Sequence, residues 1–166
     1  MLSKLLKPTQ RQVRFFGVIG LLLAATLTIP FGRFALQSSF YRDVYYAVQK
    51  GDVMKMQKLL ENGASPNGIR GAFIGGTPLI WATKKSDVAM MKVLIRAGAD
   101  VNQQSDYQET ALMYAKAPQS AQTLIDAGAN PKLRSERGLT AWDYMKKEKL
   151  EKVAKVLEQA QKDAAS

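Results

Sequence analysis

The stretch VLIRAGADVNQ, residues 93–103, decides the fold because its pattern occurs three times in the chain. LLENGASPN (residues 59–67) and LIDAGANPK (residues 124–132) are the other two copies. Each copy joins an apolar pair to a glycine-alanine step, with the glycines at Gly63, Gly98 and Gly128. Successive glycines lie 35 and 30 residues apart. A fixed period in this range predicts a stack of structural repeats.

A second motif repeats in phase with the first. It reads GGTPLIWAT at residues 75–83, QETALMYAK at 108–116 and GLTAWDYMK at 138–146, with its threonines at Thr77, Thr110 and Thr140. A threonine hydroxyl accepts hydrogen bonds from free N–H groups at a helix start, and Pro78 suits the first helical position. We therefore expect a first helix after each threonine. The small Ala82 and Ala115 would let a neighbouring helix approach closely.

A second helix is expected to follow in each repeat. Between Thr77 and Gly98, apolar residues recur at helical spacing: Val88, Met91, Leu94 and Ile95. Gly98 should end this helix, because glycine adopts the left-handed conformation that follows many helix C-termini. Asp100 and Asn102 suit the turn that leads away, where their side chains bond to nearby backbone groups.

These residues resemble the ankyrin repeat. Its helix-start signature is similar to Thr77-Pro78-Leu79-Ile80-Trp81-Ala82, and its closing signature to Gly98-Ala99-Asp100-Val101-Asn102. The resemblance covers roughly residues 44–162. It implies an all-α solenoid of about four helix-turn-helix repeats, with turn-like fingers projecting from one side. The last helix, expected over residues 148–162, would close the stack with a polar outer face.

The chain departs from the family pattern at two places. The family histidine of the helix-start signature is replaced by Ile80, Met113 and Asp143, which implies weaker bridging between repeats. The third repeat is three residues short around Lys116, and we expect the loop between its two helices to be trimmed.

The first forty residues predict a membrane segment. Residues 15–31 carry no charge, and Arg33 is the only charged residue between residues 15 and 36. This length is about enough for a helix to cross a bilayer, so we expect a transmembrane helix or uncleaved signal anchor over residues 15–36. Four basic residues precede it and would keep the N-terminus in the cytoplasm: Lys4, Lys7, Arg11 and Arg14.

The predicted organisation follows from this orientation. A basic cytoplasmic N-terminus (1–14) precedes the membrane helix (15–36), a short linker (37–43), the repeat domain (44–162) and a tail (163–166). The repeat domain would lie on the exported side, in the periplasm or another extracytoplasmic space. A cleaved secretory signal, which would give a secreted protein, is the alternative, although no good small-x-small cleavage site is present.

The composition argues against several function classes. The chain has no cysteine and no histidine, which removes disulfides, thiolate nucleophiles and the commonest zinc ligand. Its net charge of +10 is divided evenly between residues 1–43 and 44–166, and no basic run marks a nucleic-acid-binding face. We therefore expect no enzyme activity, cofactor, metal, nucleic acid or small-molecule substrate.

Candidate partner-binding residues fall into two groups. One aligned position carries an aromatic residue in every repeat, namely Tyr46, Trp81, Tyr114 and Tyr144. These rings would form a ladder along the concave side, or they would simply pack between neighbouring helices. The second group consists of apolar residues in expected fingers, Phe73, Ile74 and Tyr107, which would bind a partner, fold back over a neighbouring finger or rest on the membrane surface.

Two hypotheses for function remain open. In the first, a membrane-tethered, non-catalytic ankyrin domain docks a protein partner by its fingers and concave groove. This format is similar to small bacterial membrane-anchored or exported ankyrin proteins, some linked to catalase protection under peroxide stress and others to toxin immunity. In the second, the chain is a structural accessory subunit of a membrane complex, and the transmembrane helix makes the specific contact.

Overall fold

A computed structural model describes residues 41–68 and 76–163, and these residues form helices and turns without any strand. They all belong to the unit Phe40–Ser166. The predicted transmembrane helix over residues 15–36 lies outside the described residues. Residues 41–50 are helical, and the elements that follow are α2 (Val53–Glu61), α3 (Pro78–Lys84), α4 (Val88–Arg96), η1 (Ala111–Tyr114), α5 (Pro118–Asp126), α6 (Ala141–Lys147) and α7 (Glu151–Asp163).

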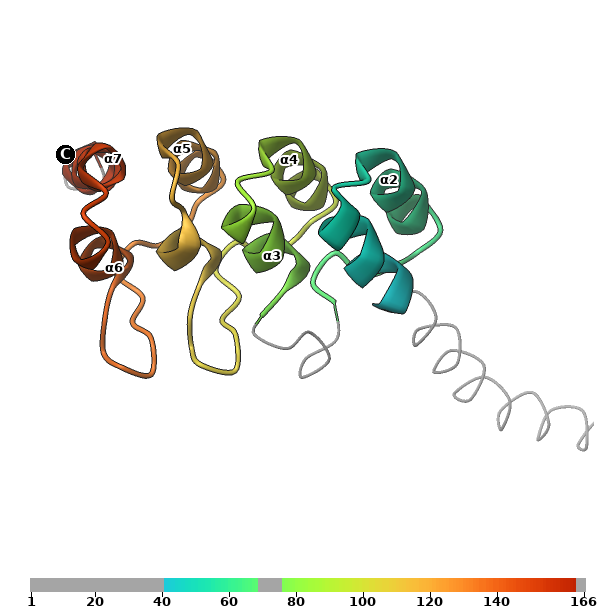
Figure 1. The fold of residues 1–166 in the computed structure, drawn as a ribbon, viewed down its shortest axis with the longest axis horizontal. Coiled ribbons are helices and arrows are strands. Elements are labelled where there is room, and N and C mark those ends of the chain that lie inside the picture. Colours follow the sequence, from blue (N-terminus) through green and yellow to red (C-terminus); the bar gives the residue numbers. More distant parts are fainter. Residues whose placement is uncertain (1–40, 69–75, 164–166) are drawn as a thin grey trace, which may run out of the picture. The chain divides into compact units, whose positions relative to one another are not determined.

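The helices form antiparallel pairs that stack side by side in two rows (Figure 1). One row holds the first helix of each pair, which is the helical segment 41–50, α3, η1 and α6. The other row holds the second helices, α2, α4, α5 and α7. Helix α3 packs against both α4 and η1, and α5 packs against both α4 and α7. Each pair is therefore supported by its neighbours in the stack, as expected for a repeat array.

The predicted threonine caps are present in two of the three repeats. Thr77 Oγ1 accepts a hydrogen bond from the Ile80 N–H at 3.2 Å, and Pro78 occupies the start of α3. Thr140 forms a full capping box with Asp143, whose carboxylate accepts from the Thr140 N–H at 2.8 Å. Thr110 makes no side-chain cap hydrogen bond, so the prediction of a third cap is wrong.

The shortened third repeat loses helix rather than loop, which corrects the sequence-based expectation. Its first helix is a four-residue 3₁₀ turn, η1, where the second repeat has the seven-residue α3. The connections that follow both consist of three residues, 85–87 and 115–117. The third repeat is therefore shorter because its first helix is three residues shorter, while the loop between its two helices has the same length as in the second repeat.

The second helices end as the glycines predict. Gly98 and Gly128 both have φ of 86°, and Gly63 has φ of 89°, which are left-handed values that glycine adopts without steric cost. After α4, the Ala99 N–H donates to the Leu94 carbonyl at 3.0 Å and satisfies one of the free carbonyls at the helix end.

The hydrophobic core runs along the interface between the two rows of helices. Ala82 and Ala115 are fully buried, which confirms that small residues mark the close contacts. The largest fully buried side chains include Leu79, Ile80, Met91, Leu94, Leu112, Leu124, Met145 and Leu157. Ile80 and Met145 belong to the helix-start motifs, so these motifs contribute both the helix caps and the packing between repeats.

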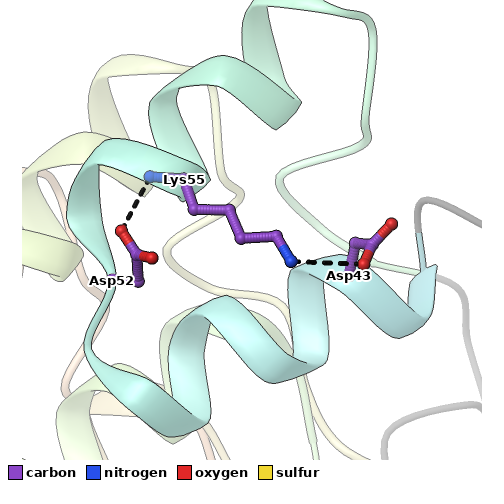
Figure 2. A network of polar contacts seen from close by, with 3 residues as sticks. All are labelled: Asp43, Asp52 and Lys55. Carbon is purple, nitrogen blue, oxygen red and sulfur yellow. Dashed lines mark hydrogen bonds and ion pairs between the residues drawn. The ribbon is translucent and has the colours of Figure 1, made fainter.

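An ion pair connects the two helices of the first pair (Figure 2). Lys55 of α2 places Nζ 3.3 Å from Asp43 Oδ1, and its own backbone N–H donates to the Asp52 N-cap at 2.9 Å. Both charged side chains are partly exposed, so the pair contributes at most about 1 kcal/mol. Asp43 was expected in the linker 37–43, but residues 41–43 are already helical.

The final helix is shorter at its start than predicted. Glu148 forms the C-cap of α6 and Lys149 has a left-handed φ of 57°, so α7 begins at Glu151. Glu148 lies outside α7 and faces Lys116 at 3.7 Å. The inner stripe of α7 is confirmed by Val153 and Leu157, which are buried. No helix in residues 41–68 and 76–163 is long and apolar enough to span a bilayer.

Candidate protein-binding surface

Within the described residues, two fingers project from the same side of the stack, over residues 101–109 and 131–139 (Figure 1). Each finger closes with a backbone bond, from the Ser105 N–H to the Glu109 carbonyl and from the Ser135 N–H to the Leu139 carbonyl, both at 2.9 Å. The Glu136 N–H donates to the Tyr107 carbonyl at 3.0 Å and joins the two fingers. The fingers therefore support each other.

Asparagines connect the bases of successive fingers. Asn67 Oδ1 accepts from the Asp100 N–H at 2.7 Å, and Asn102 Oδ1 accepts in the same way from the Asn130 N–H at 2.7 Å. Asn102 also donates from Nδ2 to the Gly128 carbonyl at 3.0 Å. The sequence predicted only local turn bonds, such as the one from the Asn102 N–H to Asp100 Oδ1. The asparagine side chains additionally fix the spacing between repeats.

The first-helix row carries a line of aromatic rings with a lysine between two of them. Tyr45 meets Trp81 edge to face, with ring centroids 6.4 Å apart. Lys84 Nζ lies 4.9 Å from the centroid of Trp81 and 4.0 Å from that of Tyr114. Cation–π attraction to both rings therefore holds this ammonium group across two repeats, and burial lowers the Lys84 pKa.

Glu109 connects the remaining rings. Its carboxylate accepts hydrogen bonds from the hydroxyls of Tyr114 and Tyr144, and Tyr144 also bonds Ser135 Oγ at 3.3 Å. Burial raises the pKa of both tyrosines, and the hydrogen bond to Glu109 adds to this shift. The polar ends of these two rings are thus engaged within the domain. Lys84 covers one face of the Tyr114 ring, with Nζ 4.0 Å from its centroid.

The structure places the predicted site residues in different environments. Trp81, Tyr114 and Tyr144 are half-buried and pack against the core, which agrees with the packing interpretation of the ladder. Tyr46 is 51 % exposed, and Tyr45 rather than Tyr46 contacts Trp81. Tyr107 is 58 % exposed on its finger. Phe73 and Ile74 lie outside the described residues.

Three residues of this surface were not predicted from the sequence: Tyr45, Lys84 and Glu109. Glu109 directly precedes the helix-start threonine and lies five residues before Tyr114. That position brings its carboxylate to the aromatic position of its own repeat and of the next. Lys84 follows Trp81 by three residues, a helical spacing that places both on one face of α3.

Two open grooves accompany these features. One of about 440 Å³ lies between α4 and α5 and is lined by Lys92, Ile95, Arg96 and Gln122, among others. The other, of about 450 Å³, lies between α6 and α7, where Lys146 Nζ stands 4.0 Å above the Trp142 ring. In the described part of the chain no three acidic side chains come together as metal ligands.

Stacked helix pairs with projecting fingers define a helical repeat protein whose exposed surface serves recognition. A family model described as "Ankyrin repeats (3 copies)" matches residues 44–135, more than half of the chain. The chain therefore belongs to the ankyrin-repeat family. Ankyrin repeats are protein–protein interaction modules, and this membership indicates a non-catalytic binding role. The pair formed by α6 and α7 extends the stack beyond the matched residues.

Curated relatives support the family assignment. A putative ankyrin repeat protein of Acanthamoeba polyphaga mimivirus is 33% identical over 107 residues, covering 61% of this chain and 66% of the relative. A putative ankyrin repeat protein of Fowlpox virus is 35% identical over 81 residues, with 46% and 13% covered. The 2-5A-dependent ribonuclease of Mus musculus is 38% identical over 69 residues, with 42% and 9% covered.

The chain spans less than two thirds of the length of each of these relatives. The likeness to the mouse ribonuclease extends over only 9% of that protein, so its named activity does not carry over to this chain.

Proposed function

We propose that this chain tethers an ankyrin-repeat domain to a membrane through residues 15–36 and docks a protein partner with its fingers and first-helix row. The domain would lie on the exported side, in the periplasm or another extracytoplasmic space. Stress protection and toxin immunity are the roles that the resemblance implies for such a module. The family supports protein binding, and the uncharged residues 15–31 with their basic flank support the tether.

The observation that carries the docking proposal is the presentation of Tyr107. Its ring is 58 % exposed, while its backbone is fixed on both sides. The Tyr107 N–H donates to Ser105 Oγ at 3.2 Å, and its carbonyl accepts from Glu136 at 3.0 Å. A large aromatic ring on a fixed backbone loses little entropy on binding, which is typical of interface anchors. Replacement with alanine should therefore cost about 2 kcal/mol of binding free energy.

Site-specific photocrosslinking tests the docking surface. A benzophenone amino acid at position 107 should form an adduct with the partner in cells that produce the full chain. The same amino acid at position 92 is the matched control, because Lys92 is exposed on the second-helix row. Equal adducts at both positions, or an adduct at position 92 alone, would refute docking through the fingers.

Membrane tethering is tested separately by protease protection. A C-terminal tag on the full chain should be lost when only the outer compartment is opened, while the untreated chain stays in the membrane fraction. Survival of the tag until the cytoplasm is opened would reverse the proposed orientation. If exchanging residues 15–36 for an unrelated transmembrane helix abolishes the adduct at position 107, the accessory-subunit hypothesis replaces docking by the repeats.

A further inference from the structure

Every turn between a first and a second helix carries an exposed lysine. These are Lys50 before Gly51, Lys85 at the C-cap of α3, Lys116 after η1 and Lys149 before α7. We call these four residues the lysine edge. Because they lie 31 to 35 residues apart, no basic run is visible in the sequence. The stacking of the pairs places the four turns at successive steps along one side of the domain.

Contacts between turns show that this edge is continuous. Lys85 Nζ donates to the Gln49 carbonyl of the preceding pair at 2.5 Å. Lys116 Nζ lies 3.7 Å from Glu148 of the following pair, and both side chains are more than half exposed. In each case one side chain reaches from its own turn to the neighbouring turn.

The acids near the lysine edge are held by contacts of their own. Asp52 and Asp87 each accept a backbone N–H as helix N-caps, from Lys55 at 2.9 Å and from Met90 at 3.0 Å. Glu148 faces Lys116 at a distance where an exposed pair contributes little. No ion pair involves Lys50 or Lys149 in the part of the chain that the structure describes. Cationic groups therefore remain accessible at all four turns.

The lysine edge also adjoins the aromatic rings of the first-helix row. Lys84, next to Lys85, lies between Trp81 and Tyr114. Lys146, three residues before Lys149, covers Trp142 at 4.0 Å. Cation–aromatic contacts therefore lie beside two of the four turns, so a segment lying on the lysine edge would meet both kinds of group.

We propose that the lysine edge and the adjoining rings bind an extended, acidic protein segment whose carboxylates alternate with aromatic or apolar residues. This inference rests on the proposed docking function and names the chemistry of the partner. The edge contains no arginine, the residue that pairs with phosphates in a bidentate manner. Asp52, Asp87 and Glu148 would repel an uninterrupted phosphate backbone, whereas a peptide can space its carboxylates between them.

The test uses the full chain in micelles of a neutral detergent and a labelled 12-residue peptide, (Glu-Glu-Tyr)₄. Fluorescence anisotropy compares two quadruple variants that each remove four positive charges. One changes the lysine edge (K50Q/K85Q/K116Q/K149Q). The matched control changes exposed lysines of the second helices (K58Q/K92Q/K152Q/K155Q). Far-UV circular dichroism and thermal melting establish that both variants fold.

The edge variant should weaken peptide binding about tenfold, since four exposed ion pairs are lost, and the control variant less than about twofold. The neutral peptide (Gln-Gln-Tyr)₄ should bind poorly to all forms. Equal losses in the two variants would overturn the inference, because net charge alone would then explain binding. Stronger edge-dependent binding to phosphatidylglycerol vesicles or to RNA than to the peptide would overturn it as well.

The two proposals can fail independently. If the adduct at position 107 forms but the acidic peptide does not bind, the docking function stands and the acidic chemistry of the partner is wrong. If the peptide binds through the lysine edge but no adduct forms at position 107, docking through the fingers is wrong.

Discussion

Replacing Asn102 with alanine tests the role of the asparagines that connect the fingers. The substitution removes the 2.7 Å bond from the Asn130 N–H and the 3.0 Å bond to the Gly128 carbonyl. Net contributions of about 0.5–1.5 kcal/mol per hydrogen bond, taken low because the site is exposed, predict a loss of about 1–2 kcal/mol in the free energy of unfolding. The measurement is urea unfolding followed by circular dichroism, with an unchanged m-value.

Substitutions of two other asparagines should cost less stability than Asn102→Ala. Asn67→Ala removes one bond to the next repeat, to the Asp100 N–H, and should cost about half as much. Asn130→Ala removes only a local bond, from the Lys132 N–H at 3.0 Å, and should cost least. Hydrogen exchange adds a local readout, because Asn102→Ala should speed exchange of the Asn130 amide. Equal costs for Asn102 and Asn130 would refute the reasoning, since the turn preference of asparagine would then account for both.

Three further predictions concern the helix caps and the half-buried Tyr114. Thr77→Val should cost about 1 kcal/mol in urea unfolding by removing a helix cap, whereas Thr110→Val should be neutral or stabilising, because the Thr110 hydroxyl is buried without a hydrogen-bond partner in the described residues. Hydrogen bonds from Thr140 lower the pKa of Asp143. The ionised Asp143 carboxylate therefore stabilises the fold above about pH 4, and this stabilisation is lost as the pH falls through the lowered pKa. Thermal melts between pH 2 and 6 should show this loss in the wild type and not in Asp143→Asn. Burial and a hydrogen bond to Glu109 raise the pKa of Tyr114. The protonated Tyr114 hydroxyl therefore contributes fully to stability below about pH 10, and this contribution is lost at higher pH. In an absorbance titration at 295 nm, the tyrosine signal that titrates last should be absent from Tyr114→Phe.

Local chemistry explains why the sequence predicted most of the described fold. Glycine tolerates left-handed backbone and threonine caps a helix, so Gly98 and Thr140 marked the helix ends without any tertiary information. The repeat period then predicted that these helices form stacked pairs. The hypotheses for residues 15–36, and for the partner, remain predictions.

The errors arose where tertiary contacts override local preference. Thr110 has the same sequence signal as Thr77, but a shortened helix follows it, and that helix leaves the hydroxyl unused. Lys149 interrupts a regular helical pattern by adopting a left-handed conformation that its residue type does not indicate. The contacts of Glu109 with Tyr114 and Tyr144 required knowing that two repeats lie side by side.

The side-chain hydrogen bonds between successive fingers all run in the same sense along the chain. Asn67, Asn102 and Gln104 each reach forward, so a side chain of the earlier finger holds the backbone of the later one. A pull on the finger at residues 131–139 would load the bonds of Asn102, Gln104 and Tyr107 to it first, and then Asn67 through Asp100. Tension applied by a bound partner would therefore travel from the C-terminal finger back toward the N-terminal pair.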